Sequence, residues 1–158
     1  MKNKKLKKML PYGIFVLGLV ASLTMFLPTL HLEGETYTGL QLMLGVDLVE
    51  FEFLGLEVAS ARIEPNMVAM ATFLSPFIAG VLTLIFKKGN TFSLAVFVLA
   101  GVLFFIFHDY VEIQYQLLEG ERESTVPQWD TNLGVLLGAF ASILAAIGEM
   151  LHISATDK

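Results

Sequence analysis

The chain has 158 residues, 55% of them hydrophobic, with a mean hydropathy of +0.69 and a formal net charge of −5. It contains no cysteine, which excludes disulfides, thiol nucleophiles and thiolate metal sites. Its only basic cluster is a run of lysines at the N-terminus, which suits anionic lipid headgroups and argues against nucleic acid as a partner.

Four long apolar segments divide the sequence, and Glu149 is the only Asp, Glu, Lys or Arg within them. About 17 to 25 helical residues cross a bilayer core roughly 30 Å thick. In lipid the backbone must satisfy its own hydrogen bonds, which favours helices. The sequence therefore predicts an all-α membrane protein, a four-transmembrane-helix antiparallel bundle that forms one membrane domain over residues 1–158. The predicted spans cover about residues 9–30, 67–86, 91–108 and 132–151.

Basic and acidic residues lie on opposite sides of this topology. All acidic residues except Glu149 and Asp157 fall in two outer segments, 31–66 and 109–131, whose only basic residues are Arg62 and Arg122. The positive-inside rule then predicts a multi-pass protein of the plasma membrane, with both termini in the cytoplasm and an acidic extracytoplasmic surface. The lysines on the cytoplasmic side are Lys2, Lys4, Lys5, Lys7, Lys8, Lys87, Lys88 and Lys158.

The lysine-rich start could also belong to a cleaved signal peptide. However, its apolar run is long for a signal peptide and no A-x-A cleavage site follows. We therefore expect the first apolar segment to be retained as a transmembrane helix.

The first outer segment shows the alternation of apolar and polar residues that is typical of β-strands. We predict a small extracytoplasmic β element of two or three short strands, and residues 40–48 could form a further strand or a short helix. The alternating runs are residues 30–33 and 35–38 around Gly34, and residues 49–53 and 56–58 around Gly55.

The second and third spans are joined by only four residues, Lys87-Lys88-Gly89-Asn90, which predicts an antiparallel helical hairpin. Gly89 is expected to take the left-handed conformation at the helix end. Asn66 is a candidate N-cap for the second span, and Asp130 or Thr131 for the fourth.

The second outer segment is predicted to extend the third helix, since residues 110–118 are rich in apolar side chains. From Glu119 to Asp130 the composition is typical of a loop. Trp129 is the only tryptophan and precedes the fourth span, so it could anchor that helix at the interface or form a binding contact with a partner.

Small residues recur at intervals of four in the fourth span, at Gly134, Gly138 and Ser142. Such residues let helix backbones approach closely. They could pack the helices of one bundle together or form a docking face for another protein.

Two histidines are candidate metal ligands. His108 and Glu112 are four residues apart at the outer end of the third span, and His31 and Glu33 alternate onto one face of a strand. If these elements meet, two imidazoles and two carboxylates could bind a divalent cation such as zinc. No other cofactor is expected.

Glu149 and His152 are three residues apart and share a helix face near the inner end of the fourth span. The pair could anchor the helix at the headgroups, sense protons or contact a partner.

The sequence lacks the usual catalytic motifs, including G-x-S-x-G, H-E-x-x-H and phosphate-binding glycine loops. The interior of the spans also lacks the ionisable groups of a proton or ion pathway, apart from Glu149. We therefore predict a protein that is not an enzyme. An enzyme would have to use residues near the lipid boundary, such as His31, His108, Asp109 and Glu112.

The order of spans and loops resembles the claudin and tetraspan proteins, which share a cytoplasmic N-terminus, a long first outer loop with strands, a tight inner turn and a shorter second outer loop. The resemblance covers the whole chain as topology. The claudin signature needs a Gly-Leu-Trp and two cysteines, whereas here Gly39-Leu40 is followed by Gln41 and cysteine is absent. No residue role is therefore carried over, and the cysteine-free loops look more like a small bacterial membrane protein.

These features predict an interaction or accessory protein whose acidic extracytoplasmic cap binds a membrane protein, a peptide or a cation. Immunity to a cationic antimicrobial peptide is one concrete form. The alternative is a subunit of an oligomeric cation channel or transporter, in which the outer carboxylates concentrate cations at a pore mouth. A homo-oligomer would fit either function.

Overall fold

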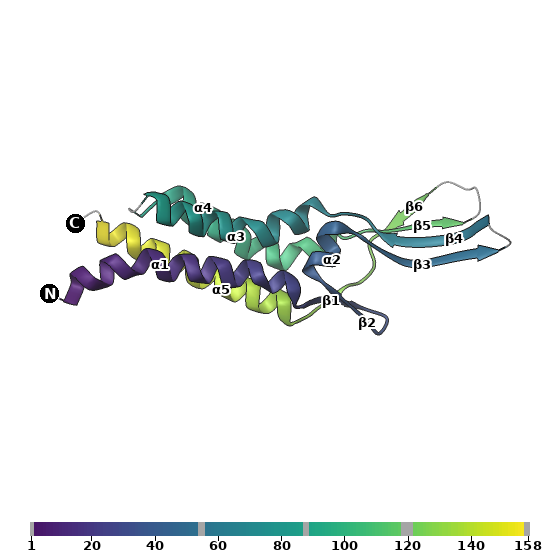
Figure 1. Ribbon diagram of the computed structural model, residues 1–158, viewed down its shortest axis with the longest axis horizontal. Coiled ribbons are helices and arrows are strands. Elements are labelled where there is room, and N and C mark those ends of the chain that lie inside the picture. The colour runs from purple at the N-terminus through teal and green to yellow at the C-terminus, as the bar shows by residue number, and fades with distance from the viewer. Residues whose placement is uncertain (1, 54–55, 87–88, 118–121, 157–158) are drawn as a thin grey trace.

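The computed structural model describes residues 2–53, 56–86, 89–117 and 122–156, and side chains within 8–49, 59–86, 89–116 and 122–156. Long helices lie side by side along an elongated molecule, and the strands gather beyond one end (Figure 1). Both termini lie at the opposite end. We call these the sheet end and the terminal end.

The described part of the chain contains four helices that are long and apolar enough to cross a membrane. Helix α1 packs against α3 and α5, and α4 packs against the same two helices. Short 3-10 segments, η1 (Thr24–Phe26) and η2 (Phe107–Tyr110), continue α1 and α4 at the sheet end. The long helices are α1 (Lys2–Leu23), α3 (Met67–Phe86), α4 (Thr91–Ile106) and α5 (Leu133–Thr156).

The helix boundaries differ from the predicted spans mainly in the first and fourth helices. Helix α1 begins at Lys2, seven residues before the predicted start at residue 9. The first span was predicted to reach residue 30, but the helical backbone ends by Phe26 and Leu27 is extended, with ψ 160°. Pro28 follows and disfavours a helical conformation at Leu27. The fourth helix continues to Thr156, five residues past the predicted end at residue 151.

The first sheet has the strand order β2-β1-β7, with antiparallel neighbours. Its strands are β1 (Pro28–Leu32), β2 (Glu35–Thr38) and β7 (Asp130–Thr131). Glu33 and Gly34 form the turn between β1 and β2 and both have positive φ, 50° and 97°. A two-residue turn with positive φ at both positions matches the twist of a hairpin. The hairpin predicted around Gly34 is confirmed.

The second sheet has the order β3-β4-β5-β6, again antiparallel, and stands farther from the helices than the first (Figure 1). The helical extension predicted over residues 110–118 is wrong, because β5 pairs with β4 as an inner strand of this sheet. The β structure is therefore larger than predicted and is not confined to the first outer segment. The strands are β3 (Val46–Phe53), β4 (Leu56–Ile63), β5 (Ile113–Leu117) and β6 (Glu123–Thr125).

A short helix, α2 (Gly39–Leu44), fills the interval between β2 and β3. A capping box begins it, because the Thr38 hydroxyl accepts the N–H of Gln41 and the Gln41 side chain accepts the N–H of Thr38. Of the two alternatives for residues 40–48, the helix is therefore found up to Leu44 and a strand from Val46.

The main core lies where the helices meet the sheets. Trp129 belongs to it, being only 7% exposed, and its Nε1 donates to the carbonyl oxygen of Val111 at 3.0 Å. Its ring meets Tyr37 edge to face, with centroids 5.8 Å apart. Trp129 is thus neither an interfacial anchor nor an exposed contact. The largest buried side chains of this core are Leu30, Leu42, Ile63, Phe73, Phe104, Phe107 and Ile113.

The small residues of α5 face the interior of the chain. Gly134, Gly138 and Ser142 are all buried. A methyl group at Gly138 would collide with the ring of Phe104 on α4. Among the described contacts, this face therefore serves packing within the chain.

Candidate functional site

A polar groove of about 170 Å³ lies on the second sheet. The strand register explains its composition. Arg62 of β4 pairs with Asp47 of β3 and with Gln114 of β5, and Ser60 pairs with Gln116. Because cross-strand partners share a face and alternate residues of a strand do too, these side chains project from the same face. The polar groups that line the groove belong to Asp47, Ser60, Arg62, Gln114, Gln116 and Arg122.

The opposite face of the sheet is apolar at its base. Ile63 and Ile113 are each one residue away from Arg62 and Gln114 along the strands, and both are buried in the core. Burial of this face fixes the register, because a slip of one residue would bring the polar groups into the core.

Polar contacts within the groove position its two arginine side chains. The Nε atom of Arg62 lies 3.3 Å from Oε1 of Glu64 and 3.9 Å from Oδ1 of Asp47. The Nε of Arg122, one residue before β6, donates to Oε1 of Gln116 at 3.1 Å. By contrast, Oε1 of Gln114 is buried and has no hydrogen-bond partner among the described residues. The groove therefore contains an acceptor that is not yet satisfied.

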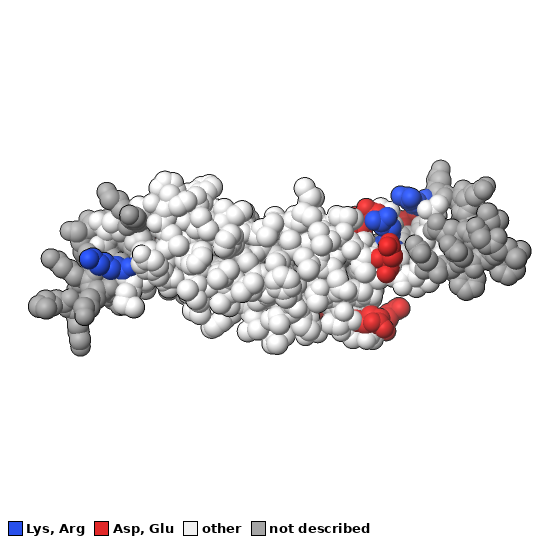
Figure 2. All heavy atoms as spheres, viewed as in Figure 1, with Lys and Arg blue, Asp and Glu red and all other residues white. Residues whose placement is uncertain are grey.

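Carboxylates surround this end of the molecule. Figure 2 shows the acidic spheres gathered at the sheet end, with the middle of the visible face uncharged. Burial, followed by the negative charges of Glu35 and Glu33, raises the pKa of the Tyr37 hydroxyl above its usual 10.0. Acidic residues with described side chains at this end are Glu33, Glu35, Asp47, Glu64, Asp109, Glu112, Glu123 and Asp130.

The four predicted metal ligands come from separate parts of the sheet end. His31 lies on β1, where its Nδ1 is 3.2 Å from Oγ1 of Thr36, and Glu33 lies in the following turn. His108 lies in η2 beside Asp109, and Glu112 is exposed after η2.

Within the described residues, no three His, Asp or Glu side chains are grouped so that they could hold a metal ion. The zinc site stays a prediction from the sequence.

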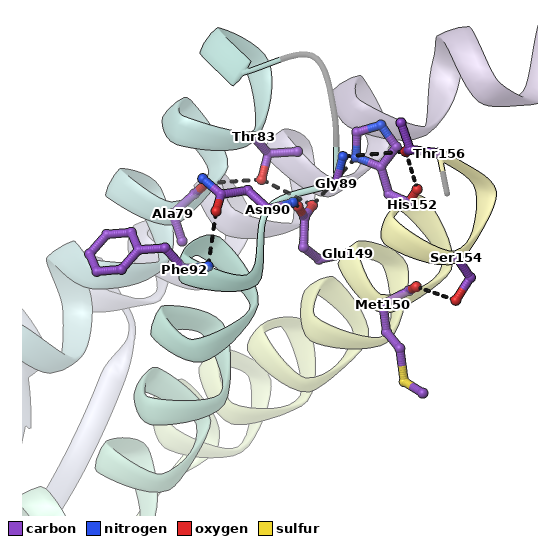
Figure 3. A network of polar contacts seen from close by, with 10 residues as sticks. All are labelled: Ala79, Thr83, Gly89, Asn90, Phe92, Glu149, Met150, His152, Ser154 and Thr156. Atoms are coloured by element: carbon purple, nitrogen blue, oxygen red, sulfur yellow. Dashed lines mark hydrogen bonds and ion pairs between the residues drawn. The ribbon is translucent and has the colours of Figure 1, made fainter. Parts of the chain in front are cut away.

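A second polar site lies at the terminal end (Figure 3). The side chain of Glu149 is fully buried, yet both oxygens have partners. Oε1 accepts the backbone N–H of Asn90 at 2.7 Å, and Oε2 is 3.1 Å from Oγ1 of Thr83 on α3. Nδ1 of His152, one turn along α5, is 3.7 Å from Oε2. Among the described groups, this His152 nitrogen has no hydrogen-bond partner.

Burial rules out two of the interpretations of this pair. His152 is 4% exposed and Glu149 is 0% exposed, so neither can anchor the helix at headgroups or contact a partner from its present position. Proton sensing by the pair stays a prediction. The contacts observed here join α5 to α3 and to the turn before α4.

The turn before α4 lies directly against α5. The N–H of Gly89 donates to Oγ1 of Thr156 at 3.4 Å, and a methyl group at Gly89 would collide with the backbone of Ile153. Gly89 does not have positive φ, so the predicted left-handed conformation is wrong. Its lack of a side chain is required for close approach instead.

Sequence reasoning missed most partners in both sites. Thr83 is one polar residue within an apolar helix, and the sequence does not indicate that it faces Glu149. The sequence does contain a signal for Gln114 and Gln116. Polar and apolar residues alternate in Ile113-Gln114-Tyr115-Gln116-Leu117, and this period of two predicts a strand with both glutamines on one face.

Neither a protein family model, nor a curated protein, nor a solved structure matches this chain.

Proposed function

We propose that this protein is a non-enzymatic integral membrane protein that binds a partner peptide or protein outside the cell. In this proposal, four helices span the plasma membrane, both termini lie in the cytoplasm, and the sheet end forms an extracytoplasmic cap. The observation that carries the proposal is the polar groove on the second sheet. It lies on the part of the fold that stands farthest from the apolar helices (Figure 1).

The charge distribution supports this orientation. Apart from Glu149, the described long helices carry no acidic side chain, whereas acidic side chains gather at the sheet end (Figure 2). Lys8 lies near the start of α1, at the terminal end. Lysine-rich segments favour the cytoplasmic side of a membrane. An acidic cap would also attract a cationic peptide over a distance of about 10 Å at moderate ionic strength, and added salt would weaken that attraction.

The orientation is tested with two single cysteines in the cysteine-free chain. Ser124 on β6 and Ser154 on α5 are both exposed, so Ser124→Cys and Ser154→Cys form a matched pair. In intact cells, a membrane-impermeant maleimide should modify the cysteine at position 124 and leave position 154 unmodified until the cells are opened. The reverse pattern would overturn the proposed orientation.

Binding is tested with the full-length protein in nanodiscs of uncharged lipid. The probe is an N-acetylated octapeptide of alternating lysine and alanine, and the matched control peptide replaces each lysine with glutamine. We expect saturable binding of the lysine peptide that weakens as salt is raised. Equal affinity for both peptides would exclude electrostatic capture by the acidic cap.

A channel or transporter subunit remains the alternative proposal, and the oligomeric state separates the two. Native mass spectrometry would detect an oligomer, and liposome assays would detect cation flux. Flux through the purified protein would favour the alternative.

A further inference from the structure

We infer that the polar groove binds the C-terminal residue of the partner peptide, through its free carboxylate and its last amide N–H. This inference rests on the proposed function and specifies which end of the peptide is recognised. It follows from the types of group in the groove, their existing contacts and the size of the space.

The basic residues of the sheet end are concentrated in the groove. Segments 31–66 and 109–131 contain only two, Arg62 and Arg122. They come from segments far apart in the sequence, yet both line this one groove. On a surface that is otherwise acidic, these two guanidinium groups make the groove the favoured place for an anionic group.

Each guanidinium keeps donors for a ligand. Arg122 uses Nε for Gln116, and this hydrogen bond fixes the plane of its guanidinium group. Arg62 has ion-pair contacts with Asp47 and Glu64, but it makes no hydrogen bond to another described residue. The side chain of Asp47 is 70% exposed, so water screens its attraction to Arg62. Arginine presents its N–H groups as a planar fork that fits the two oxygens of a carboxylate.

The unsatisfied oxygen of Gln114 distinguishes between anions. It is a buried acceptor in the same groove and needs an N–H or O–H donor. The C-terminal residue of a peptide carries an amide N–H next to its carboxylate, so it can satisfy both the arginines and Gln114. Sulfate, which carries no proton at neutral pH, offers no donor to Gln114. The groove therefore fits a peptide end better than a simple anion.

The size of the groove supports a terminal residue. Sites for whole small molecules usually measure about 300–1,000 Å³. A space of about 170 Å³ is smaller than these and suits the end group of a longer ligand. The remaining residues of a cationic peptide would then lie across the surrounding carboxylates.

The experiment compares two forms of the lysine–alanine octapeptide, one with a free C-terminal carboxylate and one with a C-terminal amide. Binding to the full-length protein in nanodiscs is compared for the two forms at low salt and measured again at raised salt. The variants are Arg122→Gln, Arg122→Lys and Gln114→Leu. Lys8→Gln is the matched control, because it removes one positive charge at the terminal end. The melting temperature of each variant verifies folding.

We expect the wild type to bind the free acid about tenfold more tightly than the amide, as a charge-assisted hydrogen bond would give. Arg122→Gln should reduce this ratio to near one, and Arg122→Lys should reduce it in part. Gln114→Leu should weaken both forms, because both carry the last amide N–H, and unchanged affinity in this variant would contradict the contact with Gln114. Lys8→Gln should keep the wild-type ratio. If Arg122→Gln does not fold, the wild-type ratio and the ratio of Arg122→Lys still test the carboxylate contact.

Two results would overturn the inference in different ways. If the acid and amide bind equally and both lose affinity in salt, the inference fails and the proposed function stands. If neither form binds at any salt concentration, the proposed function fails with it. Competition with inorganic sulfate and with N-acetylalanine provides a further test, since equal competition would mean that the groove accepts any anion.

Discussion

The carboxylate of Glu149 accepts the backbone N–H of Asn90 at 2.7 Å, although these residues are 59 positions apart in the sequence. The N–H of Gly89 likewise donates to Thr156. The first N–H groups of a helix lack intrahelical partners, and a negative charge near them is favourable. The side chains of α5 therefore cap the turn that begins α4, together with Asn90, whose own side chain accepts the N–H of Phe92 (Figure 3).

Replacing Glu149 should separate the roles of shape and of hydrogen bonding. We expect Glu149→Leu to destabilise the protein by about 2–4 kcal/mol, because it leaves the Asn90 N–H and the Thr83 hydroxyl buried without this partner. Glu149→Gln keeps an oxygen for Asn90 and should cost about 1 kcal/mol or less. Denaturation in mixed detergent micelles measures both.

The exposed neighbour Met150 provides the control for this pair. Met150→Leu should unfold like the wild type. If Glu149→Leu were as stable as Met150→Leu, the hydrogen bonds at the terminal end would contribute nothing to the fold.

Trp129 offers a spectroscopic measure of the junction between helices and sheets. Since it is the only tryptophan and is 7% exposed, its fluorescence should be blue-shifted and poorly quenched by acrylamide. Trp129→Phe should lose about 1–2 kcal/mol of stability, because the carbonyl oxygen of Val111 loses its donor. Strong quenching in the wild type would contradict the buried position.

Two glycines of α1 form a matched pair. A methyl group at Gly18 would collide with the carbonyl oxygen of Pro76 on α3, whereas one at Gly13 would meet nothing within 4 Å. A backbone oxygen cannot rotate away, so Gly18→Ala should separate the two helices and cost about 1–3 kcal/mol. Gly13→Ala should be neutral, or stabilising by up to about 1 kcal/mol because alanine favours the helix. Equal stabilities would contradict the close packing of α1 on α3.

Tyr37 should make stability sensitive to alkaline pH. Its folded-state pKa is raised, so above pH 10.0 the unfolded chain loses this proton while the folded protein keeps it. The unfolded state then binds fewer protons, and the contribution of Tyr37 to stability falls as pH rises from 10.0 through the folded pKa. Comparing the melting temperatures of wild type and Tyr37→Phe from pH 8 to 11 tests this. A difference that does not change with pH would contradict a raised pKa.

Local signals in the sequence predicted the long helices and much of the first outer segment. The apolar runs predicted the bounds of α3 and α4 to within two residues. The positive φ at Gly34 fits the turn between the two strands predicted around it. Asn66 acts as the predicted N-cap, since its Oδ1 accepts the N–H of Ala69. These features depend on neighbours within a few residues, which a sequence displays directly.

Contacts between distant segments were not predicted. The fourth helix begins after Asn132, whose Oδ1 accepts the N–H of Leu133, and the predicted caps Asp130 and Thr131 lie in β7 instead. Asp130 and Thr131 are extended because they pair with β1, and no local pattern in the sequence predicts this pairing. The groove also depends on which strand lies beside which, so its members Arg62 and Gln114 could not be connected from the sequence alone.

Both sheets combine strands from the two segments that flank the helical hairpin α3–α4, since β7 pairs with β1 and β5 pairs with β4. In the proposed topology, neither sheet can be completed during synthesis until the second segment has crossed the bilayer. Until then the edges of β1 and β4 stay open to pairing with other chains. Slow export of residues 109–131 would thus favour aggregation on the outer side of the membrane during the interval before α4 and α5 are inserted.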